Sequence, residues 1–280
     1  MSAAIPAGRP TAERNPPVPH RRKIVLTLAA LLIGLTQQAV AQRFLHGIIW
    51  PEPPVITPGD YATHSAPSDA IVLFDGKNLD AWNGVKNTKI EADGAFTVRD
   101  ALQTKQSFGD CQLHVEFATP TDTKDKKGKE RKGQARGNNG IGLMSAKYEI
   151  QVLDSYENKT YPEGQAASVY NQRPPMVNAS RKPGEWQTYD IIFIAPKFGD
   201  DGKLAKPGYI TLLHNGVLVQ NHTEIRGETA YDKENVYTKH ADKLPIVLMY
   251  HGDPVRFRNI WIREFKELVG KEGGKKGKEK

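Results

Sequence analysis

Short stretches of alternating apolar and polar residues, separated by turn residues, run through the chain from residue 71 to residue 262. In one of them Leu113, Val115 and Phe117 alternate with polar side chains, which is the period of a half-buried β-strand. Other strand-like stretches lie at residues 71–74, 96–98, 148–153, 189–195, 245–250 and 255–262. No segment sustains an apolar face at helical spacing, so the pattern predicts a protein built from strands.

Asn215 and Gly216 separate two apolar runs within residues 209–219. Asn-Gly in such a place is the strongest short-range signal of a β-hairpin, because both turn positions need positive φ. Apolar residues make up 38% of the chain, which allows a buried core, and the single cysteine, Cys111, excludes an intrachain disulfide framework. We expect Cys111 to be a small buried hydrophobe. The sequence therefore predicts an all-β fold, an antiparallel β-sandwich.

The two ends of the chain differ from this strand-rich middle. Residues 1–41 have the order of a signal peptide, with basic residues 21–23 ahead of an apolar run and an Ala-Val-Ala cleavage site at 39–41. The run is shorter than the ~20 residues that span a bilayer, so we expect no transmembrane span and an exported protein, periplasmic or secreted. An uncleaved anchor is the alternative. Residues 42–67 form a proline-rich lead-in, and residues 266–280 form a basic tail with too few apolar residues to fold.

The net charge of +7 comes from three segments rather than from the strand-rich part. Residues 1–41 and 121–136 each carry a net charge of +4 and residues 266–280 carry +3, which leaves about −4 for the rest. Nucleic-acid binding needs a basic stripe on a folded face, preferably with aromatic residues interleaved. The basic segments lack that arrangement, so we expect no nucleic-acid partner.

The predicted strand 148–153 carries polar side chains suited to a sugar. Glu149 and Gln151 share one face about 6.5–7 Å apart, and Asp154 follows at the strand end. A carboxylate and an amide on one face suit a polyhydroxyl ligand, and the carboxylate could serve as a general base. The alternative is the solvent-facing side of an edge strand.

A second group of candidates lies near the C-terminal end of the strand-rich region. Arg256 and Arg258 share a face of one predicted strand, with Phe257 and Trp261 expected on the other face. Two neighbouring arginines need anions or oxygen-rich ligands, and ion pairs with carboxylates of the sheet are the alternative. His251, just before this strand, could be a general acid or base near neutral pH or could simply cap a loop.

Six phrases of the sequence carry a family resemblance. They are LFDGKNLDAW from residue 73, GNNGIGLMS from 137, YEIQVLDSY from 148, GEWQTYDI from 184, HNGVLVQ from 214 and HGDPVRFRNIWIRE from 251. In this order they resemble the 3-keto-disaccharide hydrolase domain family over residues 68–265. The resemblance implies a bacterial protein with a concanavalin A-like jelly-roll sandwich and a concave sheet that binds sugar.

The resemblance also implies an oligosaccharide or glycoside substrate that is already oxidised at C3 of a glucosyl unit. The C3 ketone acidifies the C2 proton, so a base can remove it, the C1 aglycone can leave by elimination, and water can add to the enone. Our hypothesis assigns proton transfer to Glu149 or His251, and stabilisation of the enolate oxygen to Arg256 or Arg258.

Three further residues are candidates for orienting sugar hydroxyls: Asn139, Gln151 and Asp154. Asn139 belongs to a Gly-Asn-Asn-Gly turn whose amides could reach a sugar or could only shape the turn. A divalent metal could replace the arginines, with Asp154, Glu149 and His251 as ligands, although no spacing demands one.

Three other functions stay open. A conventional glucanase needs two catalytic carboxylates, and Gln151 stands where the second is expected. A non-catalytic carbohydrate-binding module of the cell envelope would bind sugar without turnover. A structural or interaction domain would do neither.

Overall fold

The computed structural model describes residues 48–49, 54–55, 57 and 62–272. The chain divides into two compact units, and the larger runs from Pro54 to Glu267. In the smaller unit, β1 (Ile48–Ile49) pairs antiparallel with β16 (Lys271–Glu272), which falls inside the segment predicted to be a tail. The signal peptide predicted at residues 1–41 lies outside the described residues.

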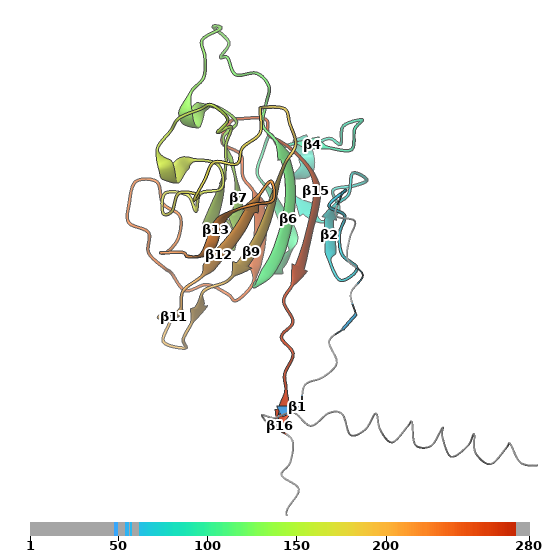
Figure 1. Ribbon diagram of the computed structural model, residues 1–280, viewed down its shortest axis with the longest axis vertical. Coiled ribbons are helices and arrows are strands. Elements are labelled where there is room, and N and C mark those ends of the chain that lie inside the picture. The colour runs from blue at the N-terminus through green and yellow to red at the C-terminus, as the bar shows by residue number, and fades with distance from the viewer. Residues whose placement is uncertain (1–47, 50–53, 56, 58–61, 273–280) are drawn as a thin grey trace, which may run out of the picture. The chain divides into compact units, whose positions relative to one another are not determined.

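The larger unit contains a seven-stranded antiparallel sheet with the order β13-β12-β9-β6-β15-β2, with β4 also paired to β15 (Figure 1). Its strands are β2 (Ile71–Phe74), β4 (Phe96–Thr97), β6 (Cys111–Ala118), β9 (Gln187–Ile194), β12 (Tyr209–His214), β13 (Val217–Glu224) and β15 (Arg256–Glu264). The hairpin predicted at Asn215 and Gly216 is confirmed. These residues join β12 to β13 with φ of 52° and 79°.

A five-stranded antiparallel sheet has the order β3-β5-β14-β7-β8. Its strands are β3 (Trp82–Asn83), β5 (Leu102–Phe108), β7 (Asn139–Leu143), β8 (Tyr148–Val152) and β14 (Leu244–Leu248). A small hairpin pairs β10 (Lys197–Phe198) with β11 (Leu204–Lys206). The helical turns of the described chain are the 3-10 turns η1 (Val85–Asn87), η2 (Gly133–Ala135) and η3 (Pro162–Gly164). Within the described residues, no helix has the length and apolar character needed to cross a membrane.

The core lies between these two sheets and follows from strand alternation. Val115 and Phe117 of β6 are fully buried, and Ile141 of β7 and Ile150 of β8 belong to the same apolar cluster. Alternate residues of each strand therefore face the core, and the others lie on the outer face of their sheet. The antiparallel β-sandwich predicted from the sequence is confirmed. Cys111 is buried in this core, as expected, and burial raises the pKa of its thiol to about 12.

The prediction that Trp261 lies opposite Arg258 is wrong. Arg258 pairs with Glu116, whereas Trp261 pairs with His114, so β15 uses one more residue than β6 over this interval. The extra residue is a β-bulge at Asn259, where φ is 44°. The bulge shifts the alternation by one position, and the Trp261 ring stacks on His114 on the outer face of the sheet.

Candidate functional site

Glu149 and Gln151 lie on the outer face of β8, as the alternation predicted, because Tyr148, Ile150 and Val152 face the core. Glu149 and Gln151 are nevertheless only 4% and 1% exposed. β8 is an edge strand of the five-stranded sheet. The alternative of an open, solvent-facing edge is wrong.

The loop that follows η3 covers this edge. The Gln151 N–H donates to the Ser168 carbonyl at 3.0 Å, and the Gln151 carbonyl accepts from the Ala167 N–H at 2.9 Å. The Tyr170 N–H donates to the Glu149 carbonyl at 3.0 Å. The backbone groups of the edge strand are therefore satisfied, and the loop brings the Tyr170 ring beside the Glu149 carboxylate.

The neighbouring strand makes room for the Glu149 side chain with a glycine. Gly140 of β7 pairs with Gln151, and Gly142 pairs with Glu149. A Cβ on Gly140 would overlap Glu149 Oε1 and would lie 2.9 Å from Met249 Sδ. The glycine thus lets the carboxylate fold across β7 toward Met249 and His251.

His251 meets the Glu149 carboxylate from the turn after β14. Its Nε2 lies 3.5 Å from Glu149 Oε1, and its side chain is 37% exposed. The interaction with Glu149 raises the pKa of His251, because a nearby carboxylate favours the charged imidazolium. The buried Asp253 holds this turn in place by accepting from the Asn138 N–H at 2.8 Å and pairing with Arg131.

These groups line a cleft of about 390 Å³, which we call the Glu149 cleft. Its other walls include Asn138, Thr229, Tyr170 and Tyr231. The Gln151 amide donates to Asn138 Oδ1 at 3.1 Å, and with the amide turned over its nitrogen would donate to Glu149 Oε1 at 3.1 Å. Burial raises the pKa of Tyr170, and its hydroxyl lies 2.7 Å from that of Tyr161. The cleft therefore offers one carboxylate, one imidazole and several neutral hydrogen-bonding groups.

Asn139 and Asp154 do not join this cleft. Asn139 pairs with Val152 on the core side of β7, is fully buried, and accepts from the Gly140 N–H through its own Oδ1 at 2.9 Å. It is the preceding residue, Asn138, that lines the cleft. The buried Asp154 accepts from Arg136 Nε at 2.9 Å, although burial outweighs this pairing and raises the pKa of Asp154.

The alternative of a divalent metal held by Asp154, Glu149 and His251 therefore lacks one of its three ligands. Asp154 does not reach Glu149 and His251, and the described part of the chain holds no group of three or more His, Cys, Asp and Glu side chains arranged around a common point.

The two arginines lie on the other sheet. Arg256 pairs with Glu91 and Asp93, and Arg258 Nε donates to Glu116 Oε2 at 2.6 Å. Both belong to β15 of the seven-stranded sheet, whereas the Glu149 cleft lies on the five-stranded sheet. The hypothesis that they stabilise an enolate beside Glu149 is therefore wrong. Ion pairing with a sheet carboxylate is confirmed for Arg258, whereas the partners of Arg256 lie in the turn before β4. The sequence does not show which sheet a strand joins.

Tyr170, Tyr231 and Thr229 line the cleft without having been predicted. They lie in loops, where no period marks a side chain as facing the site. The one sequence feature that could have pointed to Tyr170 is its aromatic side chain in an irregular segment.

The sequence profile of the 3-keto-alpha-glucoside-1,2-lyase-like domain matches residues 69–263, which is most of the chain. The chain belongs to this family. The resemblance predicted from the six phrases is thereby confirmed.

One solved structure is similar to this member of the lyase-like family in both sequence and fold. It is a candidate glycosyl hydrolase from Parabacteroides distasonis with 44% sequence identity and a TM-score of 0.72, and the match covers 81% of this chain and 96% of that one. A second candidate glycosyl hydrolase from the same organism has 22% identity and a TM-score of 0.50 over 70% of this chain and 99% of that one, and it shows the fold alone. No protein among the curated sequences matches the chain. Family and near relative together indicate a glycosidase.

Proposed function

We propose that the chain is an exported bacterial enzyme that cleaves the glycosidic bond of 3-keto-glycosides in the Glu149 cleft. The observation that carries the proposal is the pairing of a nearly buried carboxylate with a partly exposed histidine, 3.5 Å apart, within a cleft of about 390 Å³. A base and an acid side by side are what an elimination requires. The signal-like order of residues 1–41 supports export.

The first step is removal of the C2 proton. Glu149 takes the proton, and the electron pair of the C–H bond forms the enolate whose charge rests on the C3 oxygen. His251 is the acid of the pair, because its raised pKa keeps the imidazolium populated to higher pH. Tyr170 remains a neutral O–H donor because burial raises its pKa, and we assign it to the enolate oxygen in place of the arginines.

The second step breaks the bond between C1 and the aglycone oxygen. The enolate electrons re-form the ketone and create a C1–C2 double bond, while the leaving oxygen takes a proton from His251. Addition of water across the double bond then gives the free 3-keto sugar. Release of the enone before hydration would make the same cleavage a lyase reaction.

The carboxylate count argues against conventional hydrolysis. A retaining or inverting glycosidase uses two carboxyl groups, about 5–5.5 Å or 6.5–9.5 Å apart. Among the residues that line the Glu149 cleft, Glu149 alone is acidic, and Gln151 occupies the neighbouring outward position of β8.

The test measures aglycone release from a 3-keto-glucoside and from the same glucoside without oxidation. We expect turnover of the keto form alone, and a fall of about 10²–10⁴-fold in Glu149→Gln, because that is what a general base contributes. Glu234→Gln removes the same charge from an exposed position and is expected to keep full activity. Turnover of the plain glucoside would point to conventional hydrolysis, and no reaction with either would point to a binding module.

A further inference from the structure

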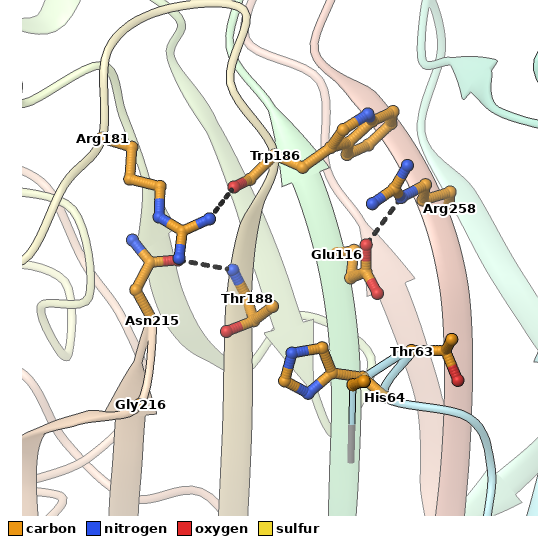
Figure 2. A pocket seen from close by; sticks show the side chains of 10 residues that line it. Thr63, His64, Glu116, Arg181, Trp186, Thr188, Asn215, Gly216 and Arg258 are labelled. Carbon is orange, nitrogen blue, oxygen red and sulfur yellow. Dashed lines mark hydrogen bonds and ion pairs between the residues drawn. The ribbon is translucent and has the colours of Figure 1, made fainter. Parts of the chain in front are cut away.

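A second cleft, of about 460 Å³, lies on the outer face of the seven-stranded sheet (Figure 2). Thr188 of β9, Glu116 of β6 and Arg258 of β15 form one row across three neighbouring strands, because Glu116 is the direct partner of both others. Asn215, in the β12–β13 turn, extends the row by accepting from the Thr188 N–H at 2.9 Å. We call this the Arg258 cleft. It shares no residue with the Glu149 cleft and lies on the other sheet.

The floor of the Arg258 cleft is the Glu116 carboxylate, which already has hydrogen-bond and ion-pair partners within the protein. Glu116 is 3% exposed, and it accepts from Arg258 Nε at 2.6 Å and from Asn259 Nδ2 at 2.7 Å. Although burial opposes ionisation, the neighbouring His114 ring and hydrogen bonds from Asn259 and Arg258 lower the pKa of Glu116 to about 2. Glu116 is therefore an anion with its own partners and does not need a cationic ligand.

The walls carry donors that still lack acceptors. The Arg258 guanidinium lies 4.2 Å from the centre of the Trp186 ring. Within the described part of the chain only its Nε donates, to Glu116, which leaves the two terminal nitrogens available. Arg181 donates from Nη1 to the Trp186 carbonyl at 3.1 Å and forms no ion pair within residues 62–272. Figure 2 shows the two guanidinium groups at opposite sides of the cleft. Two guanidinium groups against one saturated carboxylate leave the cleft with a net positive charge.

We propose that the Arg258 cleft binds the carboxylate of an acidic sugar, a uronate unit. A guanidinium matches a carboxylate in plane and spacing, and the stacking on Trp186 holds Arg258 ready for it. A bare anion would leave most of 460 Å³ unfilled, whereas a pyranose ring fills it and places its hydroxyls against Thr188 and Asn215. The site is a binding site beyond the proposed cleavage reaction.

The test is an NMR titration of the full chain with three monosaccharides that differ only at C6: galacturonate, galactose and galactose 6-sulfate. The readout is the indole N–H signal of Trp186, which Trp186→Phe identifies by its loss. We expect galacturonate to shift this signal with saturation and galactose to leave it in place. Sulfate is tetrahedral and bulkier than a carboxylate, and the ester oxygen places it further from the ring, so we expect galactose 6-sulfate to bind more weakly.

Variants then locate the contact. Arg181→Gln removes the net positive charge of the cleft, because Glu116 already balances the charge of Arg258, and it is expected to weaken galacturonate binding about tenfold. Lys182→Gln removes an adjacent exposed charge that does not line the cleft, and it should leave binding unchanged. Glu149→Gln should also leave it unchanged, even where it abolishes cleavage. Equal binding of galactose, tighter binding of the sulfate, no shift with any sugar, or an unaffected Arg181→Gln variant would each overturn the proposal.

Discussion

Replacing Gly140 by alanine tests whether the cleft depends on the close approach of Glu149 to β7. The new Cβ would overlap Glu149 Oε1 and would lie 2.9 Å from Met249 Sδ. Both atoms are at the ends of flexible side chains, so the carboxylate moves away rather than the backbone. A displacement of about 1 Å at a reacting group can cost about 100-fold in rate, which is about 2.7 kcal/mol in the barrier. The fold should lose only about 1 kcal/mol, the lower end of the cost of overpacking.

Gly142→Ala is the matched control on the same strand. Its Cβ would lie 2.7 Å from Cα and Cβ of Ala146, and backbone cannot move aside as a side-chain end can. Compared with Gly140→Ala, we therefore expect Gly142→Ala to lose more free energy of unfolding and less kcat in the molecules that fold. Urea unfolding and aglycone release from a 3-keto-glucoside, measured on both variants, give the two numbers. Full activity in Gly140→Ala would refute the position assigned to the Glu149 carboxylate.

Three further predictions follow from the pKa values and the core. Since Glu149 raises the pKa of His251, activity that needs the imidazolium should fall as pH rises through a value above 6.5, and a pH profile of His251→Gln should lack that limb. Ionised Glu116 stabilises the fold above its unfolded pKa of about 4.5, by on the order of 3 kcal/mol, and this is lost as pH falls toward 2. Arg258→Ala should therefore raise the midpoint of acid unfolding followed by circular dichroism, and an unchanged midpoint would count against the pairing. Phe117→Ala, at a fully buried position, should lower the free energy of unfolding by about 3–5 kcal/mol in urea.

The strands and one face of the cleft could be predicted because they depend on neighbouring residues alone. Alternation places Val115 and Phe117 in the core, and the same rule places Glu149 and Gln151 together on the outer face of β8. Asn-Gly at 215–216 forms its hairpin for a reason contained in two residues.

What could not be predicted depends on register and on which strands become neighbours. The bulge at Asn259 places the Trp261 side chain on the outer face of the sheet instead of the core side. No residue type in this segment predicts a bulge. A shift of one position decides that Asn138 rather than Asn139 lines the cleft. Tyr170 reaches Glu149 through a loop that folds back on β8, a contact that strand periodicity does not encode.

The separation of the arginines from Glu149 bears on the chemistry more than any other difference. An arginine stays protonated at neutral pH, so it can stabilise an enolate but cannot give a proton to the leaving oxygen. An imidazolium is also a cation, and it can lose its proton near neutral pH. With Arg256 and Arg258 ion-paired on the other sheet, Glu149 faces His251 and neutral hydroxyl groups instead. The observed arrangement therefore keeps both proton transfers of the elimination within one pair, Glu149 and His251, and needs no arginine.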